Sequence, residues 1–409
     1  MENTSAPKTA AEIAAHQLLA HCLEGTHWPE ELVDRLIEDD SSRALFSIVV
    51  ERLSDLFEPR LCDVYAELFS EVIGRLLPDD LHAPHLVERY GRIRRPRVAA
   101  VPDLSVRNVF VLSRVTLGAD VAVTSVVLDA AKRAYPNAVI YFTGPQKSWE
   151  LFADDPRLQH MPLQYGRASN VRERLRVWPE LREAVCRRRS IVIDPDSRLT
   201  QLGLLPICAE DSYYFFESRA YDAASHDSLA QLTKRWVAET FGIADAKPYI
   251  AASPLTTTLP EFRTAVSLGV GENPAKRLPD PFETELLKRL PQPLLIDKGA
   301  GGEEAERVER AVEACGGDVH VWDGSFAGFA AHIRRSHLFV GYDSAGAHVA
   351  AACGVPLVSI FAGFPNERMF ERWRPTGEGP IRVVKVEPGS DPWEEVLAAV
   401  AQMTAETAA

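Results

Sequence analysis

The side chains best suited to chemistry lie in the segment GYDSAGAH, residues 341–348, which holds a carboxylate, a hydroxyl, two glycines and an imidazole. A strand-like apolar run, 338–340, precedes it, and a small-residue helical run, 349–353, follows. Free backbone N–H groups at a helix start attract anions, and small residues let a phosphate approach the backbone. The pattern predicts a phosphate-binding turn at the carboxyl edge of a parallel sheet. The alternative is a plain N-cap formed by Asp343 and Ser344.

A second candidate turn, GVGENPAKRLP, covers residues 269–279. Two glycines followed by the adjacent cations Lys276 and Arg277 would suit a pyrophosphate. The segment is not a dinucleotide fingerprint, because Pro274 stands where the third glycine belongs, and no Gly-Lys-Ser/Thr P-loop occurs in the chain. A solvated Lys-Arg pair is the alternative.

A third candidate is Asp120, in the segment SRVTLGADVAVT that follows the buried strand-like run 108–112. Gly118 permits a sharp turn, so Asp120 is expected near a helix start at the same edge of a sheet, facing a cleft. A carboxylate there could act as a general base. It could equally be an ordinary charge that interacts favourably with a helix dipole.

Other chemistries find no support in the sequence. Residues 341–346 are not a nucleophile elbow, because Tyr342 occupies a position that needs glycine, and neither an H-E-x-x-H motif nor the kinase signature set occurs. The six cysteines are scattered without a C-x-x-C pair. Reduced, mostly buried thiols are therefore expected, with no structural zinc or iron–sulfur site.

Bulk properties restrict the class of protein. The 409 residues allow two or three domains, each with its own core. A net charge of −13 argues against a nucleic-acid partner and against strong adhesion to anionic membranes. The sequence has no run long enough to span a bilayer, and residues 1–5 do not begin a signal peptide. We therefore expect a cytoplasmic protein.

Periodicity divides the chain into an α-helical part and two α/β parts. Residues 1–103 show helical spacing of apolar residues, 104–255 alternate strand and helix patterns, 256–395 repeat that plan, and 396–409 are the end of a last helix and a tail. The expected strands are 108–112, 138–142, 190–194, 213–216, 265–268, 294–296, 319–322, 338–340 and 357–361.

These segments together resemble glycosyltransferase family 9, the ADP-heptose heptosyltransferases of lipopolysaccharide assembly. Residues 112–124 resemble the family's S-x-G-D-x-x-x-T, with Ala119 as one extra residue. Residues 274–279 resemble P-x-K-R-W-P, with Leu278 in place of Trp. Residues 343–356 resemble D-[ST]-G-x-x-H-x-A-A-x-x-G-x-P, with Ala345 for the first glycine. Further matches are R-W-x-P-x-G at 372–377, Y-P-x-A at 135–138 and His226. The resemblance covers about 106–395.

The resemblance implies a GT-B fold, in which two Rossmann-like doubly wound domains face a cleft, here with an added N-terminal helical domain. It implies inverting, metal-independent transfer of a heptose-like sugar, with no cofactor beyond an ADP-linked sugar donor. Asp120 would be the base, while Lys276 and the helix start at 344–348 would stabilise the departing diphosphate. The implied donor-binding residues are Gly271, Lys276, Arg277, Glu303 (or Glu304), Asp343, Ser344, Ala345, Gly346 and His348, and the acceptor-side residues are Arg114, Thr116 and Gly118.

Sugar transfer also requires an acceptor. A glycan or glycolipid is expected, while a weak peripheral membrane contact and a protein partner bound by the helical domain stay open. Several arginines could face an anionic glycolipid or form a solvated helix face: 167, 172, 174, 176 and 187–189. Two other classes remain: a repurposed GT-B protein that binds a nucleotide or partner without transfer, and a nucleotide-sugar epimerase or hydrolase.

Overall fold

The computed structural model describes residues 9–101, 103–166, 170–253, 260–271 and 273–408. Arg167 and Glu272, which belong to segments discussed above, lie outside these ranges. Its strands form two parallel sheets, a five-stranded sheet in the order β3-β2-β1-β4-β5 and a six-stranded sheet in the order β11-β10-β9-β6-β7-β8. Both orders follow the doubly wound Rossmann pattern, which confirms the predicted α/β fold class.

The chain packs into two compact units. The first comprises residues 1–97 and 163–225, and the second comprises 98–162 and 226–409. The predicted domain boundaries (1–103, 104–255, 256–395 and 396–409), and the cleft that the resemblance implies, stay predictions.

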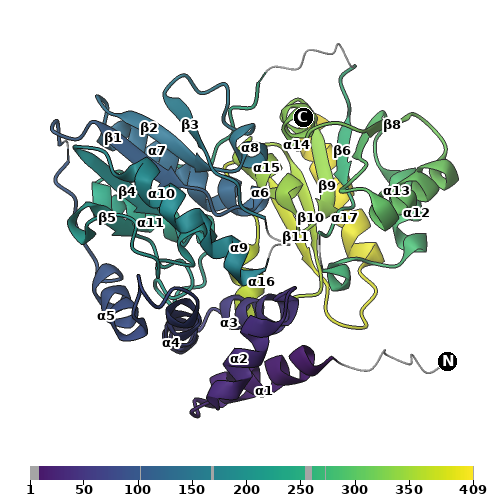
Figure 1. Cartoon of the computed structure of the whole chain (residues 1–409). Coiled ribbons are helices and arrows are strands. Elements are labelled where there is room, and N and C mark those ends of the chain that lie inside the picture. Colours follow the sequence, from purple (N-terminus) through teal and green to yellow (C-terminus); the bar gives the residue numbers. More distant parts are fainter. Residues whose placement is uncertain (1–8, 102, 167–169, 254–259, 272, 409) are drawn as a thin grey trace. The chain divides into compact units, whose positions relative to one another are not determined.

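The described N-terminal part of the first unit, 9–97, is helical as predicted, with no strand (Figure 1). Thr9 and Glu12 form a capping box at the start of its first helix, and Gly25 ends that helix in the left-handed region. Stacked rings of Tyr65 and Phe69, with centroids 5.2 Å apart, lie in its core. The elements are α1 (Ala10–Glu24), α2 (Glu30–Glu38), the π-helical turn η1 (Leu45–Val50), α3 (Glu51–Asp55), α4 (Pro59–Leu76) and α5 (Ala83–Ile93).

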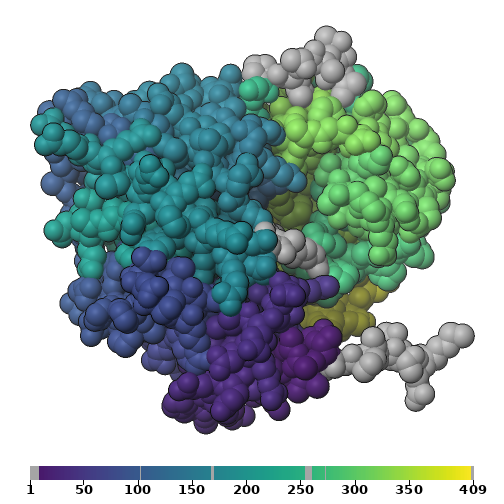
Figure 2. Space-filling view, in the orientation of Figure 1, coloured from purple at the N-terminus to yellow at the C-terminus, as the bar shows by residue number. Residues whose placement is uncertain are grey.

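The same unit holds the parallel strands β4 and β5, in register at Val192 and Tyr213. Buried polar contacts join α5 to the segments after these strands. Arg89 Nη1 donates to the Gly203 carbonyl at 2.7 Å, and Glu217 accepts from Tyr90 and Arg94. Figure 2 shows the purple and blue N-terminal helices packed against the teal part of this unit. The remaining elements are α9 (Val171–Leu175), α10 (Val177–Val185), β4 (Ser190–Asp194), η3 (Arg198–Thr200), η4 (Glu210–Ser212) and β5 (Tyr213–Phe215).

The second unit begins with β1, β2 and β3, which pair in parallel. β1 and β2 are predicted correctly, but β3 was not expected, because its sequence LQHMP has little apolar character. Helix α11 packs against α7 on this part of the unit. The elements are β1 (Asn108–Leu112), α6 (Leu117–Ala119), the π-helical turn η2 (Asp120–Thr124), α7 (Ser125–Ala134), β2 (Val139–Gly144), α8 (Gln146–Trp149), β3 (Leu158–Pro162) and α11 (Leu229–Phe241).

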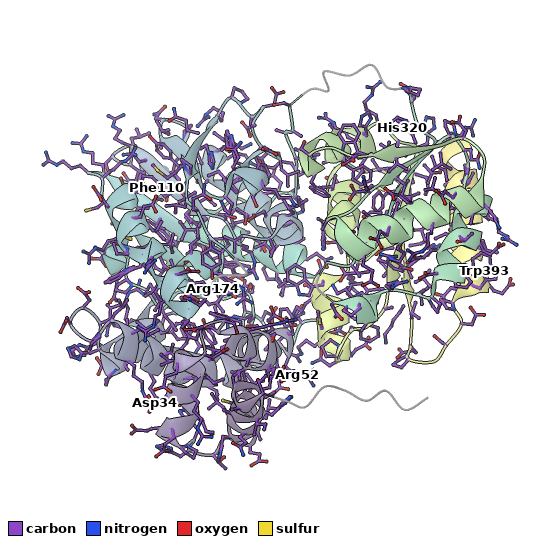
Figure 3. All side chains as sticks on the ribbon, turned by 45° about the vertical axis from the view of Figure 1, so that its right-hand side comes forward. Asp34, Arg52, Phe110, Arg174, His320 and Trp393 are labelled. Carbon is purple, nitrogen blue, oxygen red and sulfur yellow. The ribbon has the colours of Figure 1, made fainter. Side chains whose placement is uncertain are left out.

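The six-stranded sheet completes the second unit. Trp393, at the start of α17, packs on Phe282 and Arg289 of α12 (Figure 3). The expected strands are confirmed, whereas the edge strand β11 was not expected. The elements are β6 (Thr264–Ser267), η5 (Pro274–Lys276), α12 (Asp280–Arg289), β7 (Leu294–Asp297), α13 (Gly302–Cys315), β8 (Val319–Trp322), α14 (Phe326–Ile333), β9 (Leu338–Tyr342), α15 (Ala345–Ala352), β10 (Leu357–Phe361), α16 (Glu367–Trp373), β11 (Ile381–Lys385) and α17 (Trp393–Ala408).

None of the six cysteines forms a disulfide, as expected. The expectation that most of them are buried is wrong. Only Cys22 and Cys62 are buried, Cys186 is exposed and the other three are half-buried.

Candidate donor-binding site

The two predicted phosphate turns follow neighbouring strands. β6 and β9 pair in parallel, with Ser267 opposite Gly341, so the segments after them leave the same edge of the sheet. The sheet order reverses between these two strands. In open α/β sheets, ligands bind at the carboxyl ends of the strands at such a switch point. The structure thus places both turns where the fold favours a ligand.

Two glycines allow this close approach. A Cβ atom added to Gly341 would lie 2.5 Å from the Ser267 carbonyl oxygen, and one added to Gly346 would lie 2.7 Å from the Phe339 ring. Real Cβ atoms do not come that close to backbone or ring atoms. Glycine at 341 and 346 therefore lets β9 and the start of α15 pack tightly against β6.

Lys276 and Asp343, predicted separately from the two turns, form an ion pair. Lys276 Nζ lies 2.5 Å from Asp343 Oδ2. The Asp343 side chain is 5% exposed and that of Lys276 is 18% exposed, so a cation is held at the edge of the sheet with part of its surface open. A lysine ammonium in this position can donate to the oxygens of an incoming phosphate.

Ser344 takes the N-cap position of α15 but does not cap the helix. Its side chain makes no cap hydrogen bond, and its buried hydroxyl has no partner among the described residues. The plain N-cap alternative is therefore wrong for Ser344. A helix start without a side-chain cap, with an unpartnered hydroxyl beside it, keeps its hydrogen-bonding groups available to an anion.

A buried polar network fixes the segment that carries Lys276. The Tyr342 hydroxyl accepts from the Leu278 backbone N–H at 3.0 Å and donates to Glu283 Oε1 at 2.9 Å. Glu283 also pairs with Arg307, whose Nη2 donates to the Leu268 carbonyl at 2.8 Å. Burial raises the pKa of Glu283, while the charge of Arg307 and the hydrogen bond from Tyr342 oppose that shift. The network ties together the two ends of the turn that holds Lys276.

Replacing Tyr342 with Phe should lower the free energy of unfolding by about 1–3 kcal/mol, because the buried Leu278 N–H loses its acceptor. Tyr165→Phe is the matched control, since the Tyr165 hydroxyl has no partner among the described residues. Its removal should change stability by at most about 0.5 kcal/mol. Urea unfolding of both variants measures the difference. Equal losses in the two would show that the Tyr342 hydroxyl does not hold the turn.

The predicted acceptor-side turn touches the predicted donor-binding helix. A Cβ atom on Gly118 would lie 3.2 Å from His348 Cδ2 and 3.4 Å from the Ala345 Cα atom. His348 also packs edge-on against Trp373, with ring centroids 6.0 Å apart. Burial lowers the pKa of His348, although Asp343 opposes the shift. The structure thus brings Gly118, Ala345 and His348 together, with His348 mainly in a packing role.

Asp120 lies inside the protein, fully buried. Its carboxylate accepts from the Arg114 backbone N–H, the Ser113 hydroxyl and the Thr124 hydroxyl, each at 2.7 Å. Burial raises the pKa of Asp120, and these hydrogen bonds oppose the shift. The expected exposure to an open cleft is not seen, and its role as a base stays a prediction.

The extra residue Ala119 coincides with a π-helical turn. α6 ends at Ala119, and η2 runs from Asp120 to Thr124 before α7 resumes regular α-helix. A π-helical turn accommodates one additional residue within a helix, and such turns are frequent at functional sites. The helix therefore absorbs the insertion at the turn that carries Asp120.

The other predicted residues are dispersed. Arg277 pairs with Asp280 on the following helix, and Gly271 is exposed in the left-handed region, at φ 61°. Arg114 and Thr116 are half-buried in the turn before Asp120.

Glu303 is exposed, whereas Glu304 is half-buried. A Cβ atom on Gly269 would lie 2.6 Å from Glu304 Oε1, and one on Gly299 would also collide with that side chain. The structure therefore favours Glu304 over Glu303 as the residue that faces the turns.

Sequence reasoning missed Asp297, the last residue of β7. Burial raises its pKa to about 6; the charge of Glu304 adds to the shift, while the hydrogen bond from Gly299 and the charge of Lys147 oppose it. A carboxylate directly after the apolar run 294–296 was the available signal. Asp297, Glu304 and Lys147 add titratable groups to the strand ends of the second unit.

The raised pKa of Asp297 predicts a pH dependence of stability. The folded protein holds this proton more tightly than the unfolded chain, so the contribution of Asp297 to stability declines as the pH rises from about 4 to 6. Asp297→Asn should remove that decline. Denaturant unfolding of wild type and variant between pH 4 and 7 measures it, and parallel pH profiles would contradict the prediction.

Several solved structures share this fold. The fold is shared with a glycosyltransferase of family 9 from Veillonella parvula DSM 2008, at 17% identity and a TM-score of 0.57, over 76% of this chain and 99% of that protein. It is shared with the E. coli ADP-heptose lps heptosyltransferase II, at 18% identity and a TM-score of 0.53, over 74% and 100%. The E. coli heptosyltransferase WaaC, solved with ADP, matches at 18% identity and a TM-score of 0.51, over 73% and 99%. These are GT-B glycosyltransferase folds.

A family model also matches part of the sequence. The model of glycosyltransferase family 9 (heptosyltransferase) matches residues 297–379, which include Asp343, Ser344 and His348. The resemblance to this family is confirmed, and with it the class of enzyme, a heptosyltransferase-like glycosyltransferase. No curated protein matches the chain.

The described residues contain neither a metal-binding cluster nor a membrane-spanning helix. No group of three or more His, Cys, Asp or Glu side chains there is placed to hold a metal ion. Within the same residues, no helix has the length and apolar character to cross a bilayer.

Proposed function

We propose that the protein is an inverting, metal-independent glycosyltransferase that moves a heptose-like sugar from an ADP-linked donor to a glycan or glycolipid acceptor. The observation that carries the proposal is the arrangement of Lys276, Asp343 and Ser344 at the switch point of the six-stranded sheet. A partly exposed cation, an uncapped helix start and a hydroxyl without a partner among the described residues form one set of donors for a diphosphate.

In this mechanism, the acceptor hydroxyl oxygen attacks the anomeric carbon from the face opposite the diphosphate. The bond from that carbon to the diphosphate oxygen breaks, and the diphosphate leaves with the electron pair. Lys276 and the start of α15 stabilise its growing negative charge. Asp120 receives the hydroxyl proton, either directly or after its carboxylate turns from the buried network toward the acceptor.

A second candidate function is nucleotide binding without transfer. The full burial of Asp120 favours it, because three donors already occupy its carboxylate. In that case, the two turns would still hold a nucleoside diphosphate, and Asp120 would serve only to shape the segment between β1 and α7.

Donor turnover separates the functions. The protein is incubated with ADP-, UDP- and GDP-linked sugars, with and without candidate glycan acceptors, and released nucleotide and sugar products are measured. Nucleotide release that requires an acceptor supports transfer. Release without an acceptor, or conversion to an isomeric nucleotide sugar, would replace transfer by hydrolysis or epimerisation. Tight binding without turnover under any condition would identify the binding protein.

Activity and ADP binding should survive EDTA, because Lys276 and the start of α15 supply the positive charge that a divalent cation would otherwise provide. The assay compares turnover in excess EDTA, in magnesium and in manganese. A strict requirement for either metal ion would contradict this charge arrangement.

A further inference from the structure

The first unit contains a group of buried hydrogen-bond donors that lack acceptors. Arg219 Nη1, Gln201 Nε2 and the Tyr165 hydroxyl have no partner among the described residues. Arg219 is 5% exposed and Gln201 is 1% exposed, so water at the surface does not satisfy them. A buried donor without a partner lowers the stability of the fold and is rare in native proteins. Several such donors in one unit therefore indicate that a ligand or buried water supplies the acceptors.

These groups gather where β4 and β5 end. Gln201 follows β4 and Arg219 follows β5, and the two strands are parallel. Tyr65 of α4 connects them. Its hydroxyl donates to the Gln201 carbonyl at 3.3 Å, and its ring lies 5.0 Å from the Arg219 guanidinium carbon. The carboxyl ends of parallel strands are the usual ligand edge of such sheets.

Arg219 is oriented by a carboxylate. Its Nε and Nη2 atoms donate to the two oxygens of Asp196 at 3.0 and 3.1 Å, and Ser218 donates to the same carboxylate at 2.8 Å. A two-point pair of this kind fixes the plane of the guanidinium group. Nη1 is thereby held in a set direction with its hydrogens unused.

Arg198 is the second arginine of this group. Arg198, in the turn η3 that follows β4, is half-buried, and its side chain makes no hydrogen bond or ion pair among the described residues. The Tyr65 hydroxyl lies within electrostatic range of Arg198, Arg219, Asp196 and Tyr165. Asp196 pairs with Arg219, whose charge also acts on the buried Glu217, whereas the Arg198 guanidinium has no ion-pair partner among the described residues.

Tyr165 is held against the N-terminal helices through Arg174, labelled in Figure 3. The Arg174 guanidinium lies 3.5 Å from the Phe46 ring centroid and 5.9 Å from that of Tyr165. Arg174 is 8% exposed. The predicted alternatives for Arg174, a solvated helix face or contact with a glycolipid, are therefore wrong: it packs inside the unit and supports the wall that carries Tyr165.

We propose that Arg198, Gln201, Arg219 and Tyr165 form a binding site for an oxyanion, a phosphate or a carboxylate group. The unused groups are hydrogen-bond donors, and the Arg198 guanidinium has no ion-pair partner among the described residues, so the expected partner is rich in acceptor oxygens and negatively charged. Arg198 and Tyr165 are the two part-exposed residues of this group. Where the proposed function holds, the anion is carried by the acceptor glycan, and the N-terminal helices take part in acceptor recognition through Tyr65.

Calorimetry with inorganic phosphate tests the site without any assumption about transfer. Arg198→Ala and Gln201→Asn should each weaken phosphate binding by about tenfold or more, because the first removes a donor to a charged oxygen and the second withdraws the amide donor by one methylene group. Asn is chosen at 201 because the backbone there is left-handed, at φ 50°. Arg182→Ala, which removes an exposed arginine of the same unit, is the control and should leave binding unchanged.

Further titrations identify the source of the anion and separate this site from the donor-binding site of the second unit. A monosaccharide phosphate is compared with the same sugar without phosphate. Tighter binding of the sugar phosphate than of free phosphate identifies a glycan-borne anion, and equal binding identifies the free ion. Lys276→Ala must leave this binding intact. No phosphate binding by the wild type, or binding that follows Lys276 and ignores Arg198, would overturn the proposal and leave buried water as the partner of these donors.

Discussion

Lys276→Ala is expected to weaken ADP binding by about 1.5–3 kcal/mol, because one charge-assisted contact to the diphosphate is lost. The ion pair adds to the effect. With the lysine gone, the 5% exposed Asp343 carboxylate has no counter-charge and faces the anionic ligand alone. Calorimetry with ADP, UDP and GDP on wild type and variant gives the measurement, and ADP should be the tightest of the three.

Lys298→Ala is the matched control for this variant. Lys298 also forms an ion pair, with Asp323 at 2.9 Å, but on an exposed surface of the same unit. Its loss should leave ADP affinity unchanged. Thermal unfolding of both variants checks that the folded state persists, since removing one partner of a part-buried ion pair destabilises a protein. ADP affinity that ignores Lys276 would remove that residue from the donor site.

Asp120→Asn is expected to reduce sugar transfer by roughly a hundredfold or more while ADP binding and the fold are kept. Asparagine has nearly the same shape, and its amide oxygen can still accept from Arg114 and Thr124. The Ser113 hydroxyl can rotate to accept from the amide nitrogen. If Asp120 only shapes the turn, the same substitution leaves transfer nearly unchanged.

Asp194→Asn provides the comparison for Asp120. Asp194 is also fully buried, at the end of β4, and accepts from Ser197, Thr200 and Tyr213. It repeats the chemical change at a carboxylate that holds the turn η3 and has no assigned role in the chemical step, so transfer by both variants is measured at saturating acceptor. A comparable loss of transfer in both variants would attribute the effect of Asp120→Asn to structure.

The sequence was most informative where a feature depends on neighbouring residues. The runs 108–112 and 338–340 predict strands because buried parallel strands are continuously apolar. The turns at 269–277 and 341–348 stand out because glycines and charges follow such runs directly. β3 and β11 escaped prediction because both are edge strands, with sequences that mix polar and apolar residues.

The pairing of Lys276 with Asp343 lies beyond local reasoning. The two residues are 67 positions apart and meet only because β6 and β9 are neighbours in the sheet. The burial of Asp120 was missed for a related reason. Its environment depends on the π-helical turn that follows Ala119 and on Ser113 seven residues earlier, and neither contact has a periodic signal in the sequence.

The unpartnered donors of the first unit also depend on contacts between residues that are far apart in the sequence. Arg219, Gln201 and Tyr65 come from three distant segments, and each alone resembles an ordinary core residue. Only the folded chain shows that the donors outnumber the acceptors available to them.

A crystal structure with bound ADP tests the central claim most directly, namely that the turns after β6 and β9 hold a nucleoside diphosphate. We expect the diphosphate oxygens within hydrogen-bonding distance of Lys276 Nζ and the Ser344 hydroxyl, with the start of α15 directed at them. ADP bound elsewhere on the chain, with Lys276 still paired only to Asp343 and the Ser344 hydroxyl still without a partner, would contradict it.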